Sequence, residues 1–406
     1  MIKKIILSLC LLVGLLTFAQ EGSSSPYSFY GIGEVRFKGT ADVRSMGGVA
    51  VEQDSIHINL ENPASFSNLK LTSFAVGGSS NTTTLKTDSV SEKARRSTLD
   101  YMAVGLPLGK FGVGFGLIPY SSVGYKVKTI ADDSSTNSKT LSSTGGVSKA
   151  FLGVGYKITP KLSVGADFNY NFGTIKVINS ETNSDVESGT RETNTAKLSG
   201  VNFNLGTMYQ TKLNKTLSIY SSLNYTIAND LNSKNTRVIE TSSETNNVVQ
   251  PNEAISFSSK ISVSAGIGQV KKWLIGGRLV YQDASDLSNG YNRTSNVTYG
   301  TSGSASLGGY FIPDYSSFTS YPKRIVYRGG LKYEKTGLVI NSESIDNVGF
   351  TLGLGLPITG SFSNINIGFE MGKRGTTSSG LIQENYANIS VGLSLNDKWF
   401  EKRKFN

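Results

Sequence analysis

Apolar and polar residues alternate with a period of two over unusually long stretches of this chain. From Leu162 to Gly173, in LSVGADFNYNFG, one face is apolar and the other is small or polar, and LSIYSSLNYTIA (217–228) and ISVGLSL (389–395) repeat the pattern. Such alternation is typical of β-strands with one face against an apolar environment. Strands in soluble sheets run to roughly five or six residues, whereas tilted membrane strands need about nine to eleven. The pattern therefore predicts strands that cross a membrane.

The connections between these strands alternate in length. Short turns are expected at 109–110, 159–161, 213–215, 271–272 and 357–360. Long polar insertions are expected at 81–98, 131–139, 179–193, 232–253, 287–300, 336–343 and 374–381. Short periplasmic turns and longer outer loops are typical of an up-and-down outer-membrane barrel. The segment 312–324 breaks this alternation, and we expect it to be a longer periplasmic link.

These patterns predict an all-β fold, a transmembrane up-and-down antiparallel β-barrel of about 14 strands. The expected strands are 70–80, 99–108, 111–130, 140–158, 161–178, 194–212, 216–231, 254–270, 273–286, 301–312, 323–335, 344–357, 363–373 and 382–396. A barrel this wide is not filled by its own side chains. Residues 20–69 precede the first strand, so we expect them to form an N-terminal plug in the lumen. Within them INLENPASF (58–66) predicts a short helix, with Asn62 as N-cap and Pro63 at its first position.

The two ends of the chain complete the predicted organisation. Lys3 and Lys4 precede the apolar run IILSLCLLVGLL, which is too short to span a bilayer, and small residues stand before Gln20. This is the pattern of a signal peptide at 1–19, and it predicts export to the outer membrane. The plug is then 20–69, the barrel 70–396 and a periplasmic tail 397–406. Trp399 and Phe400 are expected in the aromatic girdle at the membrane interface.

Composition and charge exclude several kinds of function. The chain has 45 Gly and 9 Pro, which suits many strands, and its formal net charge of +10 is spread without a basic, aromatic-rich face for nucleic acid. Its one histidine is His57 and its one cysteine, Cys10, lies in the signal peptide. No nucleophile motif surrounds a serine, so we predict no enzyme, no metal site and no cofactor. GVGFG (112–116) lies inside a strand pattern, so its glycines are expected to thin the inward face.

Several segments resemble the FadL-type outer-membrane transport family, particularly its Bacteroidota branch. They include SPYSFYGIGE (25–34), RSMGGVAVEQDSIHINLENPASFSNL (44–69), GLIPYSSVGY (116–125) and INIGFEMGKRGT (365–376). The resemblance implies a fourteen-stranded barrel with a lumenal hatch. It also implies uptake of hydrophobic small molecules, such as long-chain fatty acids, which leave sideways through an opening in the wall.

The resemblance also suggests which residues would act. The expected plug or gate residues are Met46, Gly47, Gly48, His57, Asn62, Pro63 and Ala64. The wall opening of such proteins is associated with a kinked strand, for which Pro119, Gly145 and Gly146 are candidates; Pro119 is equally compatible with a plain bulge or strand end. His57 is otherwise expected to be a hydrogen-bonded plug residue.

Three functions remain open from the sequence. The first is transport of hydrophobic molecules or lipid across the lipopolysaccharide leaflet, after insertion by the barrel-assembly machinery. The second, motivated by the long outer loops and the basic tail, is a non-transporting accessory barrel of a protein secretion or assembly complex. The third is a general porin for polar solutes, which would require a loose or absent plug.

Overall fold

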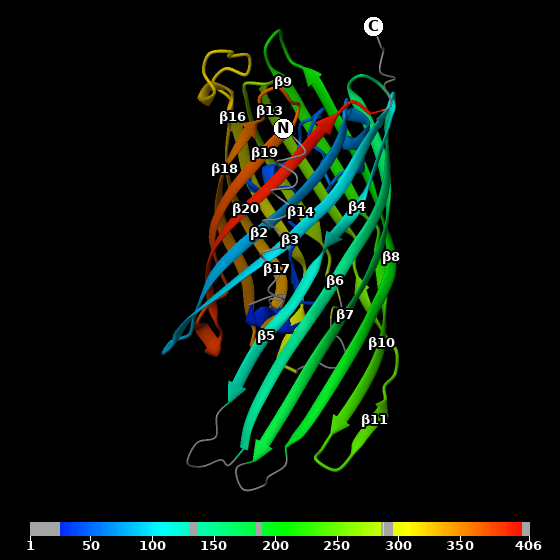
Figure 1. Cartoon of the computed structure of the whole chain (residues 1–406), viewed down its shortest axis with the longest axis vertical. Helices are drawn as coiled ribbons and strands as arrows, with labels where there is room; N and C mark the ends of the chain where they lie inside the picture. Colours follow the sequence, from blue (N-terminus) through cyan, green and yellow to red (C-terminus); the bar gives the residue numbers. More distant parts are fainter. Residues whose placement is uncertain (1–24, 130–136, 184–188, 286, 288–294, 400–406) are drawn as a thin grey trace.

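The computed structural model shows a closed antiparallel barrel, which confirms the predicted fold class (Figure 1). The structure describes residues 25–129, 137–183, 189–285, 287 and 295–399. The predicted signal peptide, Phe400 and the end of the tail lie outside these residues. The first and last wall strands, β2 (Thr72–Lys86) and β20 (Gln383–Asp397), pair over their full length and close the barrel.

The wall has fourteen strand positions, of which four are divided into shorter strands. The undivided strands are β2, β3 (Ser91–Leu108), β6 (Asn137–Lys157), β7 (Leu162–Asn183), β8 (Thr190–Lys212), β14 (Trp273–Gln282), β17 (Val326–Ile340), β18 (Glu343–Pro357), β19 (Asn364–Arg374) and β20. The first divided position consists of β4 (Phe111–Pro119) and β5 (Ser121–Thr129), and the second of β9 (Ser218–Thr226) and β10 (Asn229–Glu240). The third consists of β11 (Thr245–Val249), β12 (Glu253–Phe257) and β13 (Lys260–Gln269). The fourth consists of β15 (Val297–Tyr299) and β16 (Ser302–Phe311).

Rows of apolar side chains on the wall strands face outward, and many positions that face the lumen are polar or small. On β8, Val201 and Phe203 are 46% and 47% exposed, whereas Asn202 between them is 7% exposed. This is the reverse of a soluble protein, in which exposed apolar rows on every strand would be unfavourable. The alternation read from the sequence therefore reports an apolar outer surface and a polar interior.

Most of the predicted long outer loops are instead strand. β2 and β3 continue through most of 81–98 as a hairpin whose turn is residues 87–90, and β7 to β8, β10 to β12 and β17 to β18 extend in the same way. Polar residues mislead here because a hairpin that extends beyond the apolar band keeps its backbone ladder even where most of its side chains are polar. The expected loop 131–139 lies mostly outside the described residues, as does much of 287–300.

Residues 25–71 lie inside the barrel (Figure 1, blue). It contains η1 (Pro26–Phe29), β1 (Glu34–Val35), α2 (Ala41–Arg44) and η2 (Pro63–Asn68). Its apolar side chains pack in four clusters with inward residues of the wall, as Phe66 does with Phe151. Two further short helices, η3 (Pro322–Arg324) and η4 (Ser378–Gly380), lie in connections. Among the described residues no helix is long and apolar enough to cross a membrane.

Candidate functional site: the plugged lumen and a break in the wall

The helix η2 sits in a cradle of wall glycines. Asn62 caps it, accepting a hydrogen bond from the Ala64 amide at 3.0 Å, and Pro63 is its first residue, as predicted. The side-chain amide of Asn62 also donates hydrogen bonds to the backbone oxygens of Thr207 and Leu223, at 3.1 and 3.3 Å. A Cβ at Gly112 would lie 1.9 Å from the Phe66 carbonyl oxygen, and close approaches of the same kind occur at Gly114, Gly155, Gly165 and Gly206. Because any side chain there would displace η2, these glycines fit the plug to the wall.

The corner at Met46, Gly47 and Gly48 packs against the opposite side of the barrel. The Gly47 amide donates to the Thr351 hydroxyl at 3.0 Å, and that hydroxyl donates to the Ser45 carbonyl at 3.0 Å. Gly47 and Gly48 have φ angles of 67° and 94°, which side chains other than glycine rarely adopt. The corner is thus a tight turn held by the wall.

Arg44 of α2 joins the plug to the wall by buried ion pairs. Its guanidinium lies 2.9 Å from the Asp100 carboxylate on β3 and 3.5 Å from Glu370 on β19. Lys332 on β17 also bonds to Glu370, and these four side chains are only 5–11% exposed. Burial alone would lower the pKa of Arg44, but Asp100 and Glu370 raise it overall. Removing any one partner would leave a charge unpaired in a place with little water.

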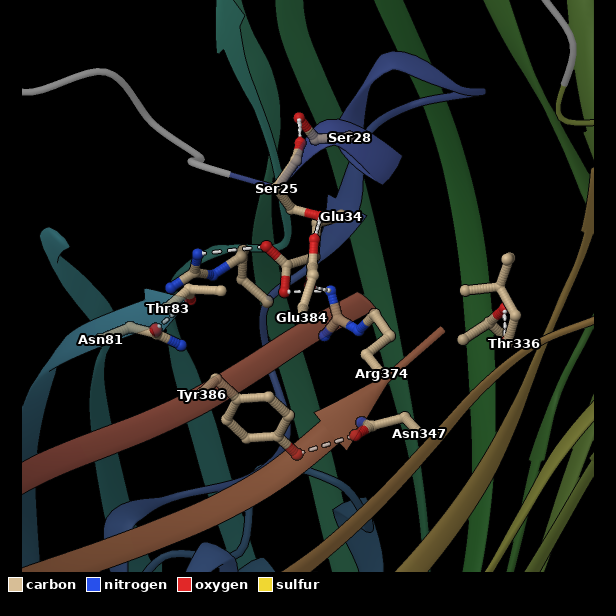
Figure 2. Close-up of polar contacts among 12 residues, drawn as sticks. Ser25, Ser28, Glu34, Asn81, Thr83, Thr336, Asn347, Arg374, Glu384 and Tyr386 are labelled. Carbon is tan, nitrogen blue, oxygen red and sulfur yellow. Dashed lines mark hydrogen bonds and ion pairs between the residues drawn. The ribbon is translucent and has the colours of Figure 1, made fainter. Parts of the chain in front are cut away.

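A second ionic cluster holds β1 of the plug (Figure 2). Arg374 on β19 lies 2.9 Å from Glu34 and 3.4 Å from Glu384 on β20. Burial would raise the pKa of Glu34, but Arg374, Arg36 and Lys38 outweigh it and lower that pKa to about 2. Glu34 is therefore ionised at neutral pH and holds β1 to this side of the wall.

Two further ion pairs join the plug to the β14–β17 side of the barrel. Lys38 lies 2.9 Å from Glu334 on β17, and Glu61 lies 2.5 Å from Arg278 on β14. Arg278 also donates to the Gly48 carbonyl at 2.8 Å. The plug is therefore anchored through charges on several sides of the lumen.

The third wall position is broken where β4 ends at Pro119 and β5 begins at Ser121. β3 pairs with β4 through Met102–Leu108, and the strand pairings of the described residues give β5 only β6 and the plug strand β1 as partners. In Figure 1, β5 runs away from β3 below the break. The carbonyl of Tyr120, the residue between the two strands, accepts the amides of Arg36 and Phe37 at 2.8 and 3.4 Å. At this point the plug chain stands where a wall strand would otherwise pair.

Gly145 and Gly146 lie on β6 directly opposite this break. Their φ angles are 114° and 151°, and a Cβ would lie 1.9 Å from the Thr174 oxygen at Gly145 and 2.2 Å from the Ser121 oxygen at Gly146. Both positions thus require glycine. The structure brings together Pro119, Gly145 and Gly146, the three residues considered from sequence for an opening.

Two cavities lie between the plug and the wall beside this break. Their volumes are about 310 Å³ and about 120 Å³, and both are lined by Val35, Phe37, Tyr120 and Phe257. The rest of the lining is mixed: apolar side chains alternate with the charged groups of the ion pairs described above. The cavities offer apolar contact next to the break.

His57 belongs to a buried polar group at the short-turn side of the plug. Its Nδ1 lies 2.7 Å from the Asp54 carboxylate, while Glu52 accepts a hydrogen bond from Tyr310 at 2.8 Å. Burial, together with Asp54, raises the pKa of Glu52 to about 7. Burial would lower the pKa of His57, but Asp54 raises it overall, and His57 in turn helps to bring the pKa of Asp54 to about 2. His57 is thus placed as a structural hydrogen-bonding residue of the plug.

We expect residues 52–57 to be held more firmly at about pH 5.5 than at about pH 8. Because the pKa of Glu52 is raised in the folded protein, folding stability is lost as the pH rises from the ordinary pKa of 4.5 to about 7. Because the pKa of His57 is also raised, its contribution to folding stability falls as the pH rises above 6.5. The Asp54 contribution is lost only below 3.8, outside this window. Hydrogen exchange at the Ile56 and His57 amides, corrected for the intrinsic pH dependence, measures the effect. Glu52→Gln should reduce it, and equal protection at both pH values would contradict this assignment.

Comparison with known proteins places this geometry in a family. A model of the BamG family matches residues 1–406, the whole chain. The chain belongs to the BamG family. No curated protein sequence matches this BamG-family chain.

Solved structures share the fold of this BamG-family protein at low sequence identity. The Ralstonia pickettii toluene transporter TbuX has a TM-score of 0.59 and 13% identity, covering 88% of this chain and 98% of its own. A Pseudomonas aeruginosa FadL homologue gives 0.57 and 10%, covering 90% and 98%, and the Pseudomonas putida toluene transporter TodX gives 0.55 and 16%, covering 87% and 96%. The FadL-type resemblance thus holds for the fold.

The charged residues that anchor the plug were missed by sequence reasoning. Glu370 and Arg374 have the same parity along β19 as the inward Asn364 and Asn366. A charge on the lumenal face of a barrel strand, rather than in a loop, was the available signal. Its partners on the plug, such as Arg44, follow no periodicity and could not be paired with it from sequence. Trp399 is 53% exposed and lies two residues beyond the end of β20; its place in an interfacial girdle stays a prediction.

Proposed function

We propose that this protein is an outer-membrane channel for hydrophobic small molecules, long-chain fatty acids or similar compounds. The observation that carries the proposal is the break at Tyr120, where β5 pairs with the plug and the cavities are lined by Val35, Phe37 and Phe257. A hydrophobic molecule gains nothing by entering water, so an exit sideways into the bilayer is favourable. The break supplies a place for such an exit.

The proposed route begins at the outer hairpins, beyond the lipopolysaccharide leaflet. A molecule would enter the cavity between plug and wall, and a shift of the plug around Met46–Gly48 or Asn62–Ala64 would let it reach the break between Pro119 and Gly145–Gly146. TbuX and TodX are toluene transporters, which supports a hydrophobic cargo for this fold. A cleaved signal peptide at 1–19 and the Bacteroidota branch of the FadL-type family are parts of this proposal.

A second candidate is an accessory barrel in a complex that assembles or secretes outer-membrane proteins. The BamG family match favours this function, since the family name points to barrel assembly. The ion pairs that hold the plug on several sides suit a permanent seal as well as a gate. In this case the partner would be a protein, and the cavities would carry no cargo.

Native purification separates the two candidates. The full chain, extracted in a mild detergent or in polymer discs, would be analysed by mass spectrometry for bound hydrophobic molecules and for co-purifying proteins. The channel proposal predicts a retained hydrophobic compound that is lost when Val35→Trp fills the cavity beside the break. A stoichiometric protein partner without such a compound would favour the accessory barrel and contradict the channel.

A further inference from the structure

Exposed lysines ring the end of the barrel that carries the short turns. They lie in or beside five successive connections on that side, after β3, β6, β8, β13 and β16, and we call them the basic rim: Lys110, Lys161, Lys215, Lys271, Lys272 and Lys323. The exposed acidic residues among the described residues at this end are Asp314 and Asp397. The rim therefore carries a clear excess of positive charge distributed around the barrel.

Some cations of the opposite end have an acidic partner, which distinguishes them from the lysines of the basic rim. Two such pairs on the long hairpins are Lys139–Glu181 at 3.3 Å and Arg237–Glu192 at 2.8 Å. Within the described part of the chain, no rim lysine takes part in an ion pair. Lys271 instead lies over the ring of Tyr315, 4.4 Å from its centroid. The rim thus has charge available for an external anionic partner.

The rim lies where the apolar outer band of the barrel ends. Phe111 follows Lys110 directly and is 49% exposed, and Leu213 and Val270, beside Lys215 and Lys271, are 58% and 44% exposed. Since a strand advances only about 3.3 Å per residue, Lys110, Lys215 and Lys271 lie within one or two residues of the apolar band along the chain. Lysines at this depth can place their stems on the apolar band and their charges among headgroups.

We propose that the basic rim binds the anionic headgroups of phospholipids in the leaflet at the short-turn side. The distribution of the charges decides between lipid and protein. Lipid surrounds a barrel on all sides and matches a ring, whereas a protein partner would cover one arc and leave the remaining lysines without a counter-charge. Anionic lipids attract basic residues near the surface within a Debye length, so the binding should weaken with salt. This inference rests on the proposed membrane location.

The test measures which lipids the protein retains. The full chain would be inserted in nanodiscs that contain phosphatidylethanolamine and phosphatidylglycerol, then released, and the lipids that stay bound would be quantified by native mass spectrometry. The rim variant is K110Q/K161Q/K215Q/K271Q/K323Q. The matched control, K86Q/K93Q/K126Q/K128Q/K335Q, removes the same number of charges from exposed positions toward the opposite end.

We expect wild type and the control to retain phosphatidylglycerol preferentially, and the rim variant to lose about threefold or more of that preference. Unchanged preference in the rim variant, or an equal loss in both variants, would overturn the inference. Cross-links from the rim to an acidic protein in native membranes, without any lipid preference, would also overturn it. Failure of the wild-type barrel to insert would contradict the proposed location itself, whereas insertion without preference contradicts only the rim.

Discussion

Replacing Glu370 with glutamine should loosen the plug and lower the free energy of unfolding by about 3 kcal/mol. Glu370 accepts bonds from Lys332 of the wall and Arg44 of the plug, and its side chain is 9% exposed. Glutamine has the shape of glutamate but no charge. The buried ammonium of Lys332 therefore loses its ion-pair partner, and Arg44 of α2 keeps only its ion pair with Asp100. Urea unfolding of the detergent-solubilised protein, followed by tryptophan fluorescence, measures the loss. Planar-bilayer recordings of the same variant should show brief openings that wild type lacks.

The matched control is Glu181→Gln, which breaks the exposed cross-strand pair with Lys139. The Lys139 and Glu181 side chains are 65% and 44% exposed, so solvent screens their attraction. The expected loss in the free energy of unfolding is less than about 1 kcal/mol. Equal effects of the two substitutions would show that the pairs around α2 do not hold the plug.

Removing residues 25–69 should turn the barrel into an open, water-filled channel. These residues hold η1, β1, α2 and η2, and a barrel of fourteen strands is too wide for its own side chains to fill. The wall should still close, because the pairing of β2 with β20 involves no plug residue. Single-channel recording should show a large, steady conductance in place of the closed wild-type level.

The control for the deletion removes residues 241–244, the turn between β10 and β11, which is remote from the plug. That variant should conduct no more than wild type. If deletion of the plug left the conductance unchanged, the plug would not seal the lumen, and a porin for polar solutes would be the better account.

The strand pattern was sufficient to predict the barrel because outward and lumenal positions alternate with a period of two residues along each wall strand. An inward asparagine and an outward valine or phenylalanine alternate along β8, so the number and order of the wall strands follow from parity alone. The hairpins beyond the membrane are mostly polar, and composition could not distinguish a paired strand such as residues 91–97 from a loop. Only the cross-strand partners reveal it.

The site could be predicted in part for a similar reason. Asn62 and Pro63 act locally, as a cap and as the first residue of a helix, and their roles are visible in the neighbouring sequence. The partners of Glu34 or Arg44 are set by which wall strand faces them across the lumen, which depends on the whole barrel. Contacts between residues that are hundreds of positions apart leave no periodic trace.

A reversible lock across the break tests the channel most directly. Val35 of the plug pairs with Ser121 of β5, so V35C/S121C places two cysteines at adjacent strand positions in a chain whose one native cysteine, Cys10, lies in the predicted signal peptide. A matched lock, T140C/S180C, joins β6 to β7 on an outer hairpin. The measurement is transfer of a labelled hydrophobic compound into vesicle membranes with and without reductant. The account predicts that oxidation blocks transfer in V35C/S121C, that reductant restores it, and that T140C/S180C is unaffected; undiminished transfer through the oxidised V35C/S121C barrel would contradict it.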